Sequence, residues 1–377
     1  MTRSLVLHDN FSDSRRQVLE TELEQVEKII KAAQPGAVST NNRFVYFAAF
    51  DGSNNDLAND GNAKNTNVAQ LWTQYISIFG RTRPNIDGNY FPGPGAKGTL
   101  TDSSWRHPAV TRQVIQTAED AYQDFAVKAS FWLKTNPGGS VTTVLTAFSR
   151  GVASAAIFSQ MLYERGLIDT KSDVRKVLIA PGQVSVSAGI IFDPVATGVS
   201  GNLAFAPNVS NIVSIRAQDE YRQLFKAVDY SAQSCVRSVP MLGNHCDIGG
   251  SYENDGISGL TLEAATTFLA NSGLPIGPLA PSRKFDGRVE FIDIHSEDAV
   301  EGGAPESKWS VYSPGPQIAS FRIHDDLPSP RLSDPHVMVK PATDQVTADG
   351  SAGQTFLMYN GTTVTTAKPA GAGTGKR

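Results

Sequence analysis

SVTTVLTAFSRGVASAAIFSQMLYERG, residues 140–166, is the stretch from which the arrangement of the whole chain can be argued. Its first part, 141–148, is apolar and rich in β-branched residues, which is typical of a buried strand. Its last part, 152–164, is rich in Ala, Ile, Leu and Met, which is typical of a helix, and Gly166 is placed to end that helix. The stretch therefore predicts a strand, a sharp turn and a helix in direct succession.

The turn itself, residues 147–151, has the form small-x-Ser-x-Gly, one residue away from the Gly-x-Ser-x-Gly turn that presents a nucleophilic serine. Such a serine must project from a very tight turn, and small residues on either side let the two backbones pass. The amide of Arg150 can then help to hold an oxyanion at the positive end of the helix. An ordinary turn with an exposed serine is the alternative; the flanking strand and helix favour Ser149 as a nucleophile.

Composition excludes several classes of function. The chain has 377 residues, a net charge of −4 and no basic block, so a nucleic-acid partner is not expected. It has no apolar run long enough to span a membrane, and its N-terminus lacks the apolar segment of a signal peptide, so we expect synthesis in the cytoplasm without a signal peptide. Two cysteines, Cys235 and Cys246, favour free thiols over a single disulfide.

The chain divides into four expected regions. Residues 1–40 carry an amphipathic helix over 12–32, and 41–275 form an α/β catalytic domain. Residues 276–360 form an irregular C-terminal extension, and 361–377 are expected to be a disordered tail. The helix has mixed charges on its polar face, so its apolar stripe is expected to pack on the protein rather than on a membrane; the stripe consists of Val18, Leu19, Leu23, Val26, Ile29 and Ile30.

Strands and helices alternate within the catalytic region, which predicts a parallel sheet. Strands are expected at 43–50, 174–180 and before Asp193, Asp219 and His245, with helices over 66–79 and 109–134. The chain order Ser149, then Asp193 or Asp219, then His245 is the order of α/β-hydrolase triads. Each residue alone has an ordinary structural alternative, such as a turn former or a core histidine. Their order and their places at strand ends together favour a catalytic site.

Five blocks of this sequence resemble those of a widespread α/β-hydrolase family that includes the type VI secretion lipase effectors, of the phospholipase Tle kind. The blocks are FDGSNN, TAFSRGVAS, IFDPV, QDEYRQLF and GNHCDIGGSY, and they span roughly residues 44–265. Residues 1–40 and 280–377 lie outside the resemblance. The sequence departs mildly from the family's pattern at four positions, where it has Ser53 for Thr, Ala147 for Gly, Pro194 for Thr and Ser251 for the third Gly.

The resemblance implies an α/β-hydrolase-like fold, with a mostly parallel central sheet flanked by helices, and it assigns Ser149 as nucleophile and His245 as general base. Asp193 lies in the block FDPV and is expected to orient the histidine, with Asp219 as the alternative. His295, His324 and His336 are alternatives for the base. No metal or other cofactor is expected, because serine, imidazole and carboxylate already supply the chemistry. The expected oxyanion donors are the amides of Gly52, Ser53 and Arg150.

Four further residues are expected to support the site. Asp51 precedes the oxyanion loop, and Asp247 is expected to fix a glycine turn by accepting backbone N–H groups. Asp219, if it is not the triad acid, is expected to pair with Arg222 and so to hold a loop of the site.

The expected activity is that of a serine esterase or lipase, most specifically a phospholipase effector and antibacterial toxin of a bacterial type VI secretion system, acting on membrane phospholipid esters. The resemblance implies a secretion-apparatus partner, an immunity protein and leaderless delivery into a target cell. Peripheral membrane contact is expected through an apolar entrance formed by Phe91 and residues 267–279. The alternatives are a soluble hydrolase of small esters and a catalytically inactive interaction module.

Overall fold

The computed structural model describes residues 13–58, 65–78, 84–96, 108–169, 176–220, 222–225, 227–252, 255–285 and 287, and the strand pairs 356–357 and 364–365. The helices are α1 (Asp13–Lys31), α2 (Asn67–Ser77), α3 (Pro108–Thr135), α4 (Gly151–Arg165), α5 (His245–Gly249) and α6 (Gly256–Asn271), with 3₁₀ turns at Gln223–Phe225 and Pro281–Arg283. The strands are β1 (Arg43–Phe50), β2 (Ile86–Phe91), β3 (Ser140–Phe148), β4 (Leu167–Asp169), β5 (Lys176–Ile179), β6 (Ser185–Phe192), β7 (Ile212–Ala217), β8 (Val236–Met241), β9 (Phe356–Leu357) and β10 (Val364–Thr365).

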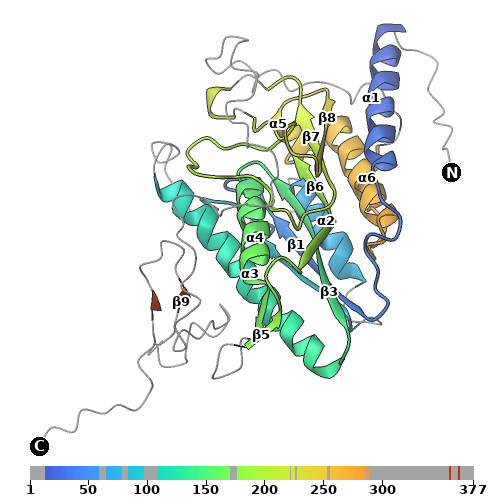
Figure 1. The fold of residues 1–377 in the computed structure, drawn as a ribbon. Coiled ribbons are helices and arrows are strands. Elements are labelled where there is room, and N and C mark those ends of the chain that lie inside the picture. The colour runs from blue at the N-terminus through green and yellow to red at the C-terminus, as the bar shows by residue number, and fades with distance from the viewer. Residues whose placement is uncertain are drawn as a thin grey trace, which may run out of the picture.

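The central sheet has six strands in the order β2-β1-β3-β6-β7-β8, and every neighbouring pair is parallel (Figure 1). The chain leaves β1 towards β2 on one side and towards β3 on the other, so the strand order reverses between β1 and β3. In open α/β sheets the crevice at such a reversal, beyond the carboxyl ends of the strands, is the usual ligand site. The expected α/β fold with a parallel sheet flanked by helices is confirmed.

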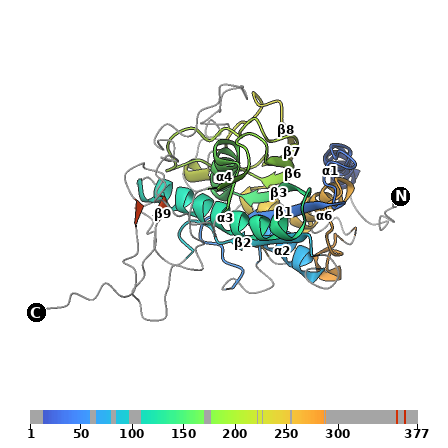
Figure 2. The ribbon, with the colours of Figure 1, turned by 60° about the horizontal axis from the view of Figure 1, so that its bottom comes forward.

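Side chains of β1 alternate between the two faces of the sheet, because successive residues of a strand point to opposite sides. Phe44, Tyr46 and Phe50 pack with α3 and α4, while Val45 and Phe47 pack with α2 and α6. The molecule therefore has three layers, and a 60° turn of the view shows α3 and α4 lying across one side of the strands (Figure 2). The strands β1, β3 and β6 are buried on both faces almost throughout, which explains why they are rich in apolar residues.

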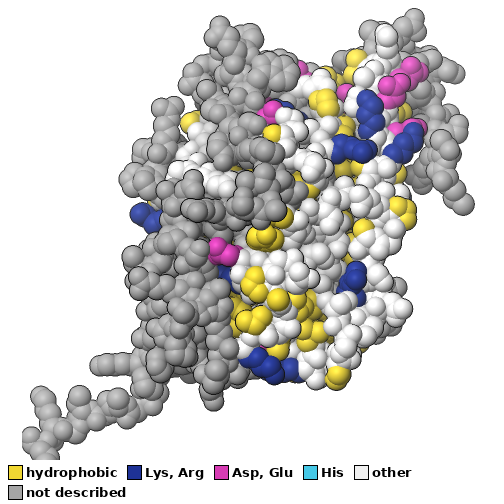
Figure 3. Space-filling model, in the orientation of Figure 1, with side chains coloured by type: hydrophobic (Ala, Val, Ile, Leu, Met, Phe, Trp, Pro, Cys, Tyr) yellow, Lys and Arg dark blue, Asp and Glu magenta, His cyan; other side chains and the backbone are white. Residues whose placement is uncertain are grey.

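The N-terminal helix α1 packs on the body of the protein, as its apolar stripe predicts. Leu19 and Ile29 are fully buried in the core that α6 and the sheet share. Acidic and basic side chains lie side by side on its outer surface, where Lys31 pairs with Glu27 at 2.6 Å (Figure 3). No helix within the described ranges is both long enough and apolar enough to cross a membrane.

Three expectations about the fold are wrong. β5, expected as a strand of the main sheet, pairs antiparallel with β4 outside it, and the edge strand β2 was not expected because its sequence IDGNYF lacks an apolar run. Most of the side chains expected to form an apolar entrance lie in the core, since Phe91 stacks on Phe50 at 5.2 Å and Phe268, Leu269, Leu274 and Leu279 are buried. These side chains complete the core instead of forming a surface for lipid.

The described elements of the C-terminal regions are the 3₁₀ turn Pro281–Arg283 and an antiparallel pair made by β9 and β10. β10 falls within the expected disordered tail, 361–377. The rest of that tail, and the expected extension beyond residue 287 apart from β9, lie outside the described residues, as do the alternative bases His295, His324 and His336.

Candidate active site

Ser149 occupies a strained turn between β3 and α4, as its motif predicts. Its φ is +55°, in the left-handed region that a serine seldom adopts, and its amide donates to the carbonyl of Phe192 at 3.1 Å. A Cβ on Gly151 would lie 2.3 Å from the carbonyl oxygen of Asp51, so only glycine fits at that position. Ala147, two residues before the serine, is fully buried within β3. The turn presents the serine at the reversal between β1 and β3.

Asp193 contacts His245 directly. Its Oδ2 lies 2.6 Å from the imidazole Nδ1, and its Oδ1 accepts the amide of Ala217 at 3.0 Å. Both side chains are buried, with exposed fractions of 1% for Asp193 and 3% for His245. A carboxylate at Nδ1 holds the proton on that nitrogen, which leaves Nε2 with a lone pair. The imidazole is therefore arranged as a base.

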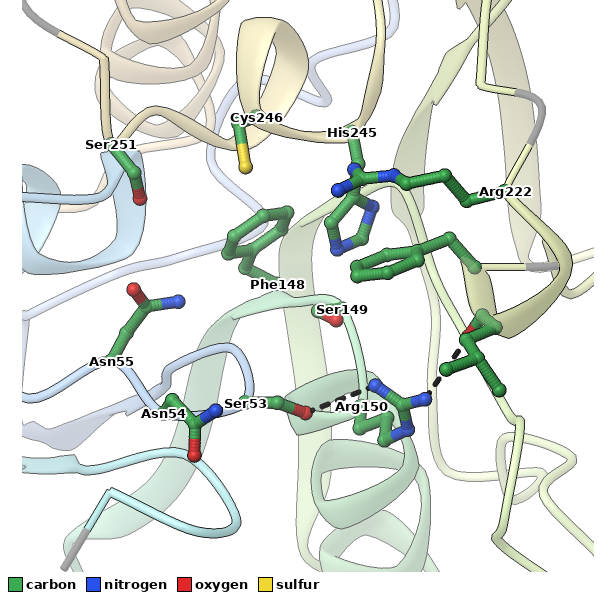
Figure 4. Close-up of a pocket in the computed structure, with 12 residues that line it drawn as sticks. Ser53, Asn54, Asn55, Phe148, Ser149, Arg150, Arg222, His245, Cys246 and Ser251 are labelled. Carbon is green, nitrogen blue, oxygen red and sulfur yellow. Dashed lines mark hydrogen bonds between the residues drawn. The ribbon is translucent and has the colours of Figure 1, made fainter. Parts of the chain in front are cut away.

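The remaining ring nitrogen of His245 faces Ser149. Figure 4 shows the imidazole above the serine, with this nitrogen turned towards the hydroxyl, and both residues line the same cavity. No hydrogen bond joins the two side chains among the described contacts, which is common before a substrate is bound. The structure thus brings together Ser149, Asp193 and His245 from the ends of three segments that are far apart in the sequence.

Aromatic rings fix the plane of the imidazole. Phe148 lies against one face of His245, with ring centroids 4.5 Å apart, and Phe225 meets it edge to face at 4.9 Å. Phe148 is itself packed tightly, because a Cβ on Gly249 would lie 2.0 Å from it. The guanidinium of Arg222 stacks on the ring of Phe225 at 3.8 Å. The histidine is consequently held by packing as well as by its carboxylate.

The loop after β1 is anchored by Asp51. Its carboxylate accepts hydrogen bonds from Thr66 Oγ1 at 2.7 Å and from Tyr90 Oη at 2.6 Å. Burial, and after it the charge of Asp51, raise the pKa of Tyr90, so its hydroxyl remains a donor. Asp51 Oδ1 also accepts the amide of Gly52 at 2.7 Å. The Gly52 amide is therefore occupied, against the expectation that it helps to form the oxyanion hole.

The Ser53 amide has no acceptor among the described residues, and Ser53 lines the same cavity as Ser149. The amide of Arg150 follows the serine directly, at the N-terminus of α4. These two amides remain the expected oxyanion donors, and the helix adds the partial positive charge of its N-terminus.

The Arg150 side chain ties together three loops around Ser149. Its guanidinium donates to the carbonyl of Thr197 at 2.7 Å, the carbonyl of Leu224 at 3.0 Å and the hydroxyl of Ser53 at 3.3 Å (Figure 4). Burial lowers the pKa of Arg150 to about 10, which still leaves it charged at neutral pH. The loops that follow β1 and β6, and the 3₁₀ turn, are thereby fixed relative to the serine.

The expected pair of Asp219 and Arg222 is wrong. Arg222 pairs with Glu220 instead, through Nη2 at 2.7 Å and Nε at 2.9 Å, and Glu220 also accepts the backbone amide of His245 at 3.2 Å. Asp219 accepts the amide of Gly243 at 2.9 Å and makes no described contact with the His245 ring. Glu220 rather than Asp219 thus neutralises Arg222, which the sequence alone could not show.

Asp247 fixes the glycine turn before the histidine, as expected. Its Oδ2 accepts the amide of Asn244 at 2.8 Å, while the Asn244 side chain accepts the amides of Cys246 and Asp247. This reciprocal arrangement caps α5, whose first residue is His245. The cap determines where the imidazole leaves the backbone.

A cavity of about 240 Å³ opens over the serine. Both cysteines are free thiols, and Cys246 lines this cavity. No group of three or more metal-ligating side chains within the described part of the chain could hold a metal ion. The lining residues are Ser53, Asn54, Asn55, Phe148, Ser149, Arg150, Arg222, Leu224, Phe225, His245, Cys246 and Ser251.

Sequence reasoning missed three contributors to this site. Glu220 lies in the block QDEYRQLF, two residues before Arg222, and this spacing could have indicated an acid that pairs with the arginine. Phe148 and Phe225 flank the imidazole, and nothing in their local pattern distinguishes them from core aromatics. Their role depends on packing between segments, which a sequence does not display.

The chain matches no known protein family and no curated protein. Among solved structures it is similar to an uncharacterized protein from Pseudomonas aeruginosa, at 14% identity and a TM-score of 0.43, over 77% of this chain and 53% of that one. It is also similar to the Tle1 effector bound to the VgrG spike from the type 6 secretion system, at 16% identity and a TM-score of 0.39, over 56% of this chain and 51% of that one. The chain thus spans about half the length of these two proteins.

A third similar structure is a thermophilic esterase from the Planctomycetes species Thermogutta terrifontis with propionate bound, at 15% identity and a TM-score of 0.33. The match covers 66% of this chain and 90% of the esterase. Likenesses at this level establish neither a family nor an activity, so the function must be argued from the residues of the site itself.

Proposed function

We propose that the protein is a serine hydrolase of carboxylic esters. One observation carries this proposal: Ser149 in a strained turn, His245 above it and Asp193 on the far nitrogen of the imidazole surround one cavity. Nucleophile, base and orienting acid in this arrangement are the requirements for acyl transfer. The chain order Ser, Asp, His agrees with it.

The reaction follows from the positions of the groups. Ser149 Oγ attacks the carbonyl carbon of the ester while its proton passes to His245 Nε2, and the amides of Ser53 and Arg150 bind the resulting oxyanion. The tetrahedral intermediate then collapses, the ester C–O bond breaks and the leaving alcohol takes the proton from Nε2. Water, deprotonated by the same nitrogen, attacks the acyl-enzyme, releases the carboxylic acid and restores the serine.

We further propose membrane phospholipids as the substrate class and delivery by a type VI secretion apparatus as the setting. The five sequence blocks support this reading, and so does a cavity that has aromatic walls beside hydrogen-bonding groups. An immunity protein in the producing cell and peripheral contact with the target membrane belong to the same proposal.

Hydrolysis of small soluble esters is a second candidate, favoured by one specific observation. Five of the side chains expected to receive lipid are buried and do not form such a surface, namely Phe91, Phe268, Leu269, Leu274 and Leu279. A cavity of about 240 Å³ also suits a short acyl chain.

The test uses purified wild type, Ser149→Ala and Ser231→Ala, the last of which removes an exposed serine that does not line the cavity. We expect wild type and Ser231→Ala to hydrolyse p-nitrophenyl butyrate and to be labelled by a fluorophosphonate. Ser149→Ala should keep its circular dichroism spectrum and lose at least about 10³-fold in kcat/KM. Fatty-acid release from phosphatidylglycerol vesicles then separates the phospholipase from the small-ester hydrolase. Undiminished turnover by folded Ser149→Ala would sink the proposal.

A further inference from the structure

We propose that Asn55 and Ser251 form a hydrogen-bonding subsite for the alcohol portion of a glycerol ester, an inference that rests on the proposed ester hydrolysis. The lining of the cavity is divided. Figure 4 shows Asn55 and Ser251 on one side of Ser149, and Arg222 on the opposite side. Leu224 and Phe225 also line the cavity and can accept apolar groups, while Asn55 and Ser251 offer hydrogen bonds.

Asn55 is held in place by its backbone while its side chain remains available. Its amide donates to the carbonyl of Gly52 at 3.0 Å, and its own carbonyl accepts the amide of Gly93 at 3.0 Å. The side-chain amide has no hydrogen-bond partner among the described residues and points into the cavity (Figure 4). Because the same loop carries the Ser53 amide, a group bound by Asn55 lies close to the ester carbonyl.

Ser251 shows two costs that a ligand would explain. Its φ is +100°, a conformation that L-residues rarely adopt. Its hydroxyl is buried and lacks a hydrogen-bond partner in the described part of the chain. A buried hydroxyl without a partner is unfavourable, and a substrate oxygen would satisfy it.

The division of the cavity orients the ester. With the carbonyl at Ser149, an acyl chain extends towards Leu224 and Phe225, and the alcohol extends towards Asn55 and Ser251. An amide and a hydroxyl can each donate and accept, which is the complement of a hydroxyl group. A glycerol unit places such hydroxyls next to the scissile bond, whereas a simple alkyl alcohol does not.

The experiment compares glycerol 1-butyrate with propyl butyrate, which share the acyl group and a three-carbon alcohol and differ by two hydroxyls. Wild type should prefer the glycerol ester in kcat/KM. Asn55→Ala, Ser251→Ala and Ser251→Gly should each lose about 3- to 10-fold on the glycerol ester, as expected for one neutral hydrogen bond, and stay within about twofold on propyl butyrate. Ser251→Gly should also keep or raise the melting temperature, because glycine relieves the strained φ.

The outcomes separate the subsite from the reaction. Equal losses on both esters, or no loss on either, would overturn the subsite while wild-type turnover of propyl butyrate upholds the hydrolase. A wild type that hydrolyses neither ester overturns both. A parallel measurement with 1-butyryl-glycerophosphocholine identifies the source of the glycerol unit. If the Asn55 and Ser251 variants also lose kcat/KM on this ester, the subsite is assigned to glycerophospholipids. If they lose it on glycerol 1-butyrate alone, the subsite is assigned to neutral glycerides.

Discussion

Asp193 Oδ2 and His245 Nδ1 lie 2.6 Å apart, although 52 residues separate them in the sequence. Asp193 follows β6, the neighbour of β3, while His245 starts α5 after β8 at the edge of the sheet. The segment between β8 and α5 therefore returns across the ends of β7 and β6 to reach the acid. The contact is made by Asp193, which the sequence favoured as the orienting acid, and not by its alternative Asp219.

Asp193→Asn is expected to remove most activity and leave the fold intact. The amide oxygen can still accept the amide of Ala217, but the NH₂ group then faces His245 Nδ1 and drives the imidazole to the tautomer with its proton on Nε2. That tautomer cannot take a proton from Ser149. The equivalent substitution in a serine protease lowers kcat by about 10⁴-fold, and we expect a loss of similar size in a steady-state assay with p-nitrophenyl butyrate.

Asp219→Asn is the matched control for that variant. Its carboxylate accepts the amide of Gly243 and does not touch the imidazole, so kcat should fall by less than about tenfold. If Asp219→Asn were inactive and Asp193→Asn active, the orienting acid would have to be reassigned to Asp219.

Glu220→Gln is expected to lower both stability and turnover. It leaves the nearly buried guanidinium of Arg222 without its carboxylate and weakens the anchor on the His245 amide. Removal of one partner from a buried pair should cost about 2 kcal/mol or more in the free energy of unfolding, measured by urea denaturation. Unchanged stability and kcat in this variant would show that the Glu220 contacts do not position the histidine.

Gly249→Ala should impair the site through packing alone. The new Cβ would lie 2.0 Å from Phe148, whose ring supports the imidazole at 4.5 Å, so Phe148 must move and His245 must follow. We expect kcat to fall by about tenfold or more, with a stability loss of about 1 to 3 kcal/mol. Gly36→Ala is the control, since its φ is +80° but no atom lies within 4 Å of the new Cβ. It should lose some stability and keep its activity; a similar loss of activity in both variants would contradict the packing argument.

Asp255 at the N-cap of α6 should make stability fall as the pH rises. Burial, and after it the charge of Asp247, raise the pKa of Asp255 to about 8. In the unfolded chain this carboxyl titrates near pH ~3.9, so between about pH 4 and pH 8 the unfolded state has released a proton that the folded state keeps. The folded state binds more protons in this window, and its stability therefore declines until about pH 8.

Asp255→Asn removes this dependence, because asparagine resembles the neutral acid and can still accept the amide of Ile257. Its free energy of unfolding should equal that of wild type near pH 4 and exceed it by about 1 kcal/mol or more at pH 8. Urea titrations at the two pH values measure this difference. A parallel pH profile for both proteins would show that Asp255 is already ionised in the folded state.

Much of the local structure could be predicted from the sequence because its signals are local. The apolar run of β3, the small residues around Ser149 and the helix-forming residues of α4 indicate a strand, turn and helix without reference to any other segment. Strand-end positions for Asp193, Asp219 and His245 follow from the same alternation. These residues fix the chain order of the site, and hence the chemistry that it suggests.

Other features were decided only by tertiary structure. The strand order places β6 beside β3, at the end of which Asp193 meets the imidazole, and Arg222 pairs with Glu220 rather than with Asp219. Burial of Phe91, Phe268, Leu269, Leu274 and Leu279 depends on the layers that cover the sheet. Hydrophobic pattern and turn chemistry report a residue's immediate neighbours along the chain, whereas pairing of distant carboxylates and closure of the core depend on which segments fold against one another.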